Sequence, residues 1–318
     1  GGFMKITWLR LLCLLLLIVL VVMVPGYAQT PIPKLATSLT TDTVIWQTLQ
    51  FWQEELARMS QDQFTVQMFP ESQLGPENDV LHGVRFGHIE IALLSVDTLL
   101  SLSPSFAAIA MPYIFRDDTH RSNVLDGPPG KRLLAGLSQY LVIGLGFLDA
   151  EPQGVFSFQT PLTTPTTFQD VTIGSAVGHC EEHTEDPQEK FILAKAVDSL
   201  MVLGVHHIPL CLEHQKEALA SGEITAWKGP LDDWNRLAAI GSKSSTFTFI
   251  PHLEHPYALV VSKRWFESLS PEEQAMLHKA SRLATLYQRQ LLNAFVQDQT
   301  TLLQNAGIQV EAVNANSF

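Results

Sequence analysis

The chain contains 318 residues, of which 32 are acidic and 20 are lysine or arginine, so its formal net charge is −12. Nucleic acids are bound through lysine and arginine patches that neutralise phosphates, and the sequence contains no such cluster, which excludes nucleic acid as a partner. The length is sufficient for two domains that each bury their own core, and the composition is that of a globular protein.

The first 28 residues differ in composition from the rest of the chain. Lys5 and Arg10 precede an apolar run from Leu11 to Val24, and Gly26 and Ala28 lie three and one residues before an expected cleavage point. This order predicts a secretory signal peptide over residues 1–28, with an uncleaved anchor as the alternative. The run is shorter than the roughly 20 residues of a membrane span, so no membrane insertion is expected after cleavage. Cleavage removes two basic residues, leaving 18 against 32 acidic ones and a net charge of −14.

The first part of the mature chain shows an alternation of strands and helices. Residues 34–38 predict a strand, and Thr40 to Asp42 can cap a helix over residues 44–59. Phe64, Val66 and Met68 alternate with polar residues, which is the period of a half-buried strand. Pro76 and Glu77 then open a helix that Gly87 ends before a strand over residues 89–94.

The alternation continues through the middle of the chain, which predicts two α/β lobes with parallel sheets. We expect helices at 120–125, 131–137, 191–203 and 213–220, a turn at 126–130, and strands at 141–147, 155–158, 171–176, 205–210 and 224–227. The chain is expected to cross between lobes near residues 149–153. Strands at 246–250 and 257–261 are then expected to return to the first lobe.

The last long element begins at Ser270-Pro271-Glu272-Glu273, a capping box with proline at the first helical position. No helix breaker follows before Asn305-Ala306-Gly307, so the helix is expected to be about 50 Å long, enough to lie across both lobes. The resulting domain prediction is lobe I over residues 29–150 and 242–270, lobe II over 151–241, and the long helix with the tail over 271–318.

Four sequence blocks resemble a known family. Phe69 to Gly75 (FPESQLG), Gly87 to Ser95 (GHIEIALLS), Met111 to His120 (MPYIFRDDTH) and Leu125 to Lys131 (LDGPPGK) are similar to the signature run of DctP-type solute-binding proteins of TRAP transporters. The resemblance implies a two-lobed periplasmic binding protein, type II-like, with a long C-terminal helix spanning both lobes. It implies a receptor rather than an enzyme, with a small organic solute and the membrane subunits of a TRAP transporter as partners, and no cofactor.

The sequence departs from this family where the ligand is expected. The resemblance implies an arginine that grips the substrate carboxylate at position 174, a second arginine at 154 and an asparagine at 229, but all three positions are glycine. Two interpretations follow: a different ligand, or a homologue that has lost transport. A different ligand is favoured because Trp227 and Lys228 could supply a stacking face and a cation. The alternative is a tryptophan in the core and a lysine in solvent.

The expected ligand contacts fall at or beside the family's contact positions, in a cleft between the lobes. They are Ser38, Ser95, Gln153, Gly174, Ser175, Leu212, Trp227, Lys228 and Gly229. Organic acids are the usual cargo of the family, and the missing arginines put a carboxylate in doubt. No nucleophile-elbow pattern surrounds Ser157 or Ser175, so a hydrolase is disfavoured.

Two Cys-x-x-His groups form a second candidate site. Cys180 with His183 and Cys211 with His214 supply thiolates and imidazoles that suit zinc or copper, and would make the chain a periplasmic metal-binding or redox protein on the same scaffold. A disulfide between Cys180 and Cys211 in an oxidising compartment is the competing use, and unrelated free thiols are the third.

Overall fold

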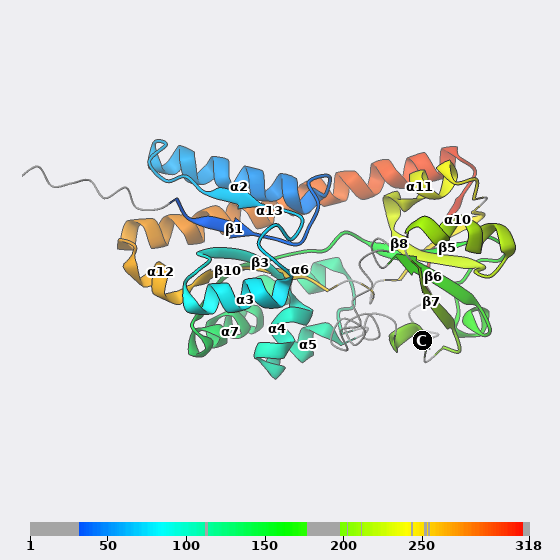
Figure 1. Cartoon of the computed structure of the whole chain (residues 1–318), viewed down its shortest axis with the longest axis horizontal. Coiled ribbons are helices and arrows are strands. Elements are labelled where there is room, and N and C mark those ends of the chain that lie inside the picture. Colours follow the sequence, from blue (N-terminus) through cyan, green and yellow to red (C-terminus); the bar gives the residue numbers. More distant parts are fainter. Residues whose placement is uncertain are drawn as a thin grey trace, which may run out of the picture. The chain divides into compact units, whose positions relative to one another are not determined.

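The computed structural model describes residues 32–111, 114–176, 198–201, 203–210, 212–242, 244–250, 253 and 255–313. These residues form two sheets with helices packed on them (Figure 1). The first sheet has the strand order β2 (Gln67–Phe69), β1 (Lys34–Ala36), β3 (Ile91–Ser95), β10 (Tyr257–Ser262), β4 (Val142–Leu148). The second has the order β11 (Gln309–Ala312), β9 (Thr246–Phe249), β5 (Gln153–Ser157), β8 (Ala226–Pro230), β6 (Thr172–Ala176), β7 (His206–Leu210).

Each face of the first sheet carries its own apolar core. On one face, α2 (Val44–Ser60) and α13 (Pro271–Asn305) cover the sheet, and Trp52, Leu56 and Leu277 are buried against it (Figure 1). On the other face, the buried side chains come from α3 (Glu77–Phe86), α4 (Val96–Leu102), α6 (Asp118–Asp126) and α7 (Pro128–Gly136). The remaining α-helices of the described part of the chain are α5 (Ala107–Ala110), α9 (Asp198–Met201), α10 (Leu212–Ser221), α11 (Trp234–Ala239) and α12 (Lys263–Ser268).

The strand directions of the second sheet bring several strand ends to one edge. Strand β6 is parallel to β7 and β8, whereas β5 is antiparallel to β8 and β9. The carboxyl ends of β6, β7, β8 and β9 and the first residue of β5, Gln153, therefore share what we call the carboxyl edge of the second sheet. Ligands of open α/β sheets bind beyond such edges.

The long C-terminal helix is confirmed. Ser270 caps α13 in a capping box: its hydroxyl oxygen accepts from the backbone N–H of Glu273 at 3.2 Å, and the Glu273 carboxylate accepts from the backbone N–H of Ser270 at 2.7 Å. Leu277, Ala280 and Ala284 pack into the core of the first sheet, whereas Leu303 packs into the core of the second. One uninterrupted helix therefore contributes to both cores.

Several local predictions differ from the structure. Strand β9 pairs with β5 in the second sheet, so the prediction that residues 246–250 return to the first lobe is wrong, and only β10 does so. Both sheets are mixed rather than parallel, because β10 is antiparallel to β3 and β4 and β5 is antiparallel to its neighbours. The turn predicted at 126–130 is short, since Pro128 already occupies the first position of α7. The helix predicted at 191–203 lies mostly outside the described residues.

The segment between β4 and β5 is held at its start by a buried carboxylate. Asp149 accepts hydrogen bonds from Arg121 Nε at 3.0 Å and Arg289 Nε at 3.1 Å. Gln288 of α13 donates to the Asp149 carbonyl at 2.7 Å and accepts from its backbone N–H at 3.3 Å. Asp149, at the start of the segment that joins the two sheets, is thus held in place by α13.

Candidate functional site

Ser38 and Ser95, two of the predicted contacts, are brought together by a carboxylate that the sequence reasoning missed. Glu77, the first residue of α3, accepts from Ser38 Oγ at 2.7 Å and from Ser95 Oγ at 2.6 Å. Thr98 Oγ1 donates to the same carboxylate at 2.6 Å. The signal in the sequence is an acidic residue in the first turn of a helix that follows a strand, where the helix dipole favours negative charge. Glu77 therefore holds in place the hydroxyls of Ser38, which follows β1, and of Ser95, the last residue of β3.

Further polar groups of the first sheet lie beside this cluster. His255 Nδ1 is 2.9 Å from Asp97 Oδ2, and the backbone N–H of Val96 donates to the carbonyl of Pro256. Burial raises the pKa of Tyr257, and the negative charges of Glu77, Asp97 and Glu151 raise it further. The Tyr257 phenol consequently stays neutral and can act as a hydrogen-bond donor.

The second sheet contributes Ser175 and Lys228 on neighbouring strands. The two residues are paired in the register of β6 and β8. Ser175 Oγ lies 2.8 Å from His207 Nε2 on β7. Burial lowers the pKa of Lys228 to about 8, although the nearby carboxylate of Asp97 acts in the opposite direction.

The histidine of this group is neutral at physiological pH. Burial lowers the pKa of His207 to about 4, and the positive charge of Lys228 contributes to the decrease. A neutral imidazole next to a hydroxyl exchanges one hydrogen bond with it and adds no charge. The arrangement of Ser175, His207 and Lys228 is therefore suited to binding a polar solute that carries negative charge.

The three glycines at the expected ligand positions are closely packed. A Cβ atom on Gly174 would lie 2.8 Å from Ile224 Cδ1 and 2.9 Å from Trp227 Cε3. A Cβ on Gly154 would lie 2.2 Å from the carbonyl oxygen of Thr248, and one on Gly229 would lie 2.1 Å from Asp233 Oδ2. Side chains larger than glycine do not fit at any of the three positions without a shift of the neighbouring atoms.

Trp227 occupies the space beside Gly174 and Gly229 and belongs to the core. Its side chain is fully buried, with 0% exposure, and its Nε1 donates to Asp233 Oδ2 at 2.9 Å. The guanidinium of Arg236 lies 5.1 Å from the centre of the ring. Trp227 therefore exposes no face on which a ligand could stack. It is a core residue, as in the alternative interpretation of the sequence. Lys228 is also largely buried, with 9% exposure, rather than in solvent.

The remaining predicted residues are only partly covered by the structure. Gln153 begins β5 at the carboxyl edge of the second sheet, and Leu212 begins α10. Cys180, His183 and Cys211 lie outside the described residues, so the predicted disulfide and metal site cannot be described, whereas His214 lies on α10. Among the residues that are described, no group of three or more histidine, cysteine or acidic side chains has the geometry to hold a metal ion.

Glu151, in the segment between β4 and β5, has a raised pKa. Glu151 Oε1 accepts from the backbone N–H of Val44, at the start of α2, at 2.5 Å. Burial and the charges of Asp232 and Asp42 nevertheless raise the pKa of Glu151 to about 7. Burial also raises the pKa of Asp232, with Asp233 and Asp42 contributing. The Glu151 carboxyl group therefore takes up a proton near neutral pH.

We expect this titration to appear in the pH dependence of stability. Because the folded chain binds the Glu151 proton more tightly than the unfolded chain does, its stabilisation is fully present below the ordinary pKa of 4.5 and is lost as the pH rises through about 7. In Glu151→Gln, the decrease in the free energy of unfolding over this range should be smaller by about 3 kcal/mol. Urea unfolding at several pH values measures it, with Glu54→Gln on the exposed side of α2 as the control. An unchanged slope in Glu151→Gln would refute the assignment.

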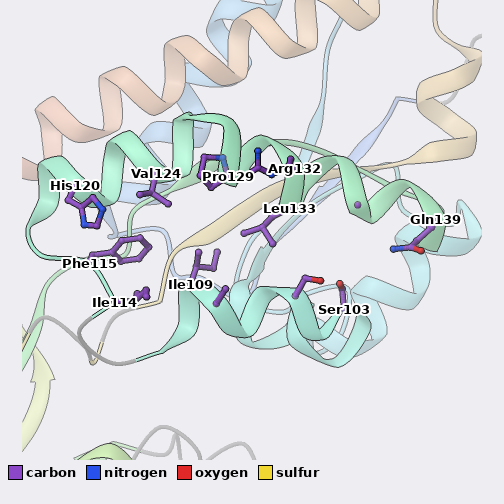
Figure 2. Close-up of a pocket in the computed structure, with 13 residues that line it drawn as sticks. Ser103, Ile109, Ile114, Phe115, His120, Val124, Pro129, Arg132, Leu133 and Gln139 are labelled. Atoms are coloured by element: carbon purple, nitrogen blue, oxygen red, sulfur yellow. The ribbon is translucent and has the colours of Figure 1, made fainter.

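A separate cavity of about 530 Å³ lies among the helices on the first sheet and contains none of the predicted contacts. Figure 2 shows Ile109, Val124 and Leu133 in its middle, with His120 and Gln139 towards opposite ends. The lining residues all come from the segment 103–139. The cavity is therefore distinct from the group of polar residues around Lys228 and Glu77.

The chain matches the model of a known protein family. The model of the family described as "bacterial extracellular solute-binding protein, family 7" (DctP) matches residues 35–175 and 242–318. The intervening stretch, which includes His207, Trp227, Lys228 and Gly229, falls outside the match. Among the described residues, no helix has both the length and the apolar character needed to cross a bilayer.

Related proteins and solved structures agree with this match. The 2,3-diketo-L-gulonate-binding periplasmic protein YiaO of Escherichia coli K12 is 25% identical over 256 residues, which cover 80% of this chain and 73% of YiaO. A TRAP periplasmic solute-binding protein from Ochrobactrum anthropi, with its C-terminus bound in the ligand-binding pocket, has a TM-score of 0.75 at 20% identity, covering 90% and 84% of the two chains. One from Xanthobacter autotrophicus Py2 with bound β-D-galacturonate has a TM-score of 0.67 at 24% identity, covering 89% of each.

Proposed function

The chain belongs to the DctP family, family 7 of the bacterial extracellular solute-binding proteins, and we propose that it captures a small organic acid in the periplasm and delivers it to the membrane subunits of a TRAP transporter. The family consists of substrate-binding receptors rather than enzymes, and the proposed action makes and breaks no covalent bond. The predicted signal peptide over residues 1–28 supports export to the periplasm.

Two groups of polar side chains carry this proposal: Ser38 and Ser95 around Glu77 in the first sheet, and Ser175 and Lys228 on neighbouring strands of the second. The negative charge of Asp97, in α4 directly after β3, counteracts the decrease in the pKa of Lys228. The sheets are joined by the segments 149–152 and 250–256 and share α13, an arrangement that permits rotation about a few residues. A solute bound between Glu77, Ser95 and Asp97 on one side and Ser175 and Lys228 on the other would favour the closed state in proportion to its contacts with both sides.

The class of solute is inferred from relatives and from the charge of the site. YiaO binds 2,3-diketo-L-gulonate and the Xanthobacter protein holds β-D-galacturonate, and both are sugar acids. Serine hydroxyls, a neutral tyrosine and a buried lysine complement the hydroxyls and the carboxylate of such a molecule. We therefore propose a sugar acid or a related hydroxy acid as the solute.

Calorimetric titration of the purified protein with D-galacturonate, D-gluconate, 2,3-diketo-L-gulonate and succinate tests this function. We expect one of the acids to bind with a dissociation constant of about 1 μM or below, which corresponds to about 8 kcal/mol. Uncharged D-galactose is the control and should bind far more weakly. Mass spectrometry of small molecules released from the freshly purified protein provides an independent identification. A protein that binds none of the four acids and releases no acidic solute would contradict the proposal.

A further inference from the structure

The cavity among the helices on the first sheet has the size of a ligand site. Its volume of about 530 Å³ lies within the range of about 300–1,000 Å³ that small-molecule sites occupy. Ser103 and Ile109 line it although both residues are buried, and Ile109 belongs to the apolar core on this face of the sheet. Arg132 and Gln139 line it as well and are exposed. The cavity therefore extends from the surface of the helices into the core.

The middle of the cavity is apolar on both sides. Ile109 of α5 lies on one side, and Val124 of α6 and Leu133 of α7 lie on the other (Figure 2). Phe115, between α5 and α6, adds an aromatic ring to the lining. Burying hydrocarbon groups against such walls is favourable, whereas the hydroxyls of a sugar acid would lose their hydration there without gaining partners. We therefore expect a ligand with a hydrocarbon body.

The polar side chains of the lining provide a positive charge and hydrogen-bond donors. Arg132 lines the cavity from α7 and carries the charge. His120 Nδ1 accepts from the backbone N–H of Arg116 at 3.2 Å, so the neutral ring holds its proton on Nε2 and can donate from there. None of the lining residues is acidic. The cavity is therefore complementary to a molecule with one negative charge.

The carboxylates next to the cavity are paired with arginines other than Arg132. Those of α6 and its N-cap form three ion pairs: Asp117 with Arg116 at 3.0 Å, Asp118 with Arg121 at 3.3 Å, and Asp126 with Arg289 at 2.5 Å. Within the part of the chain that the structure describes, Arg132 has no ion pair of its own. A guanidinium binds a carboxylate through two parallel hydrogen bonds, so Arg132 is suited to the acid group of a bound molecule.

We propose that this cavity binds a second ligand, an amphipathic monocarboxylate with a hydrocarbon body. The hydrocarbon part lies between α5 and the helices α6 and α7, and the carboxylate contacts Arg132. The proposal does not rest on the proposed function, because the lining residues all belong to the segment 103–139 and none belongs to the polar groups around Glu77 and Lys228. The protein would thus bind the solute and the amphipathic acid at separate sites.

Calorimetric titration of the wild type with octanoate tests the proposal. Octanoate is small enough for the cavity, and it should bind with a dissociation constant of about 100 μM, a value that is reasonable for a ligand of about ten non-hydrogen atoms. Uncharged octan-1-ol has the same hydrocarbon chain and should bind about tenfold more weakly, because it lacks the charge-assisted contact with Arg132. A dissociation constant for octanoate above about 1 mM would overturn the proposal.

Two variants locate the bound octanoate. Gly136 lines the cavity and has helical dihedral angles, and a Cβ atom there would have no atom within 4 Å. Gly136→Phe should therefore occupy part of the cavity without strain and weaken binding at least about tenfold. Arg132→Met should weaken octanoate binding about tenfold and leave the affinity for octan-1-ol unchanged. Lys131→Met is the matched control, since Lys131 is exposed on α7 and does not line the cavity. If either Gly136→Phe or Arg132→Met binds octanoate within about threefold of the wild type, the proposal is overturned.

Competition distinguishes this site from that of the transported solute. Saturating octanoate should leave unchanged the affinity for the tightest-binding acid of the panel. A loss of that affinity in proportion to the octanoate concentration would overturn the proposal of a separate site and leave the receptor function intact. Octanoate binding by a protein that binds none of the four acids would support this proposal and contradict only the proposed function.

Discussion

Replacing Gly174 by arginine, the residue that the family resemblance implies, is expected to lower the free energy of unfolding by at least about 3 kcal/mol. A Cβ atom at this position would lie 2.9 Å from Trp227 Cε3 and 3.0 Å from its Cζ3. Overpacking of this kind costs about 1–3 kcal/mol, and a guanidinium forced against an aromatic core without a partner costs more. Urea unfolding monitored by circular dichroism measures the change.

Two variants separate this steric effect from a general effect of glycine replacement. Gly136 at the end of α7 has no atom within 4 Å of the position of a Cβ, so Gly136→Arg should leave stability almost unchanged. Trp227→Ala should relieve the clash, and the cost of Gly174→Arg measured in that background should be clearly smaller than in the wild type. A Gly174→Arg protein within 1 kcal/mol of the wild type would show that the Trp227 ring moves aside easily.

The same region shows why only part of the site could be predicted from the sequence. The glycines at 154, 174 and 229 were recognised as departures, but a sequence does not reveal what fills the space that a missing side chain leaves. Phe247 lies 2.6 Å from a Cβ at position 154, and Trp227 lies against 174. These contacts come from strands that are distant in the chain. The prediction of a stacking tryptophan was wrong because its exposure depends on Asp233, Arg236 and the neighbouring strands.

The fold itself was more predictable because its signals are local. The capping box at Ser270 and Glu273 and the absence of breakers up to Asn305 define α13 without reference to the rest of the chain. In contrast, Thr246 to Phe249 has the same alternating pattern whichever sheet it joins, and only its pairing with β5 decides. Glu77 was missed for a similar reason, since its role depends on Ser38 and Ser95, which are 39 and 18 residues away.

Asp149→Ala is expected to lower the free energy of unfolding by about 3–5 kcal/mol, because it leaves two largely buried guanidinium groups without their shared carboxylate. The Asp149 side chain is 4% exposed, and those of Arg121 and Arg289 are 13% and 19% exposed. Arg289 also makes two hydrogen bonds to Asp126, at 2.5 and 2.9 Å, so it retains one partner in the variant.

The matched control is Asp118→Ala. Asp118 also pairs with Arg121, at 3.3 Å, but it is 86% exposed, and exposed ion pairs contribute about 0–1 kcal/mol. The free energies of unfolding of both variants can be compared with the wild type in urea, and equal losses would show that burial of Asp149 does not strengthen its pairing.

Because Asp149 begins the segment that joins the two sheets and is held to α13 through Gln288, Asp149→Ala should also weaken binding of the acid. Comparing the loss of affinity with the loss of stability then shows whether the position of this segment matters for capture of the solute beyond its effect on stability.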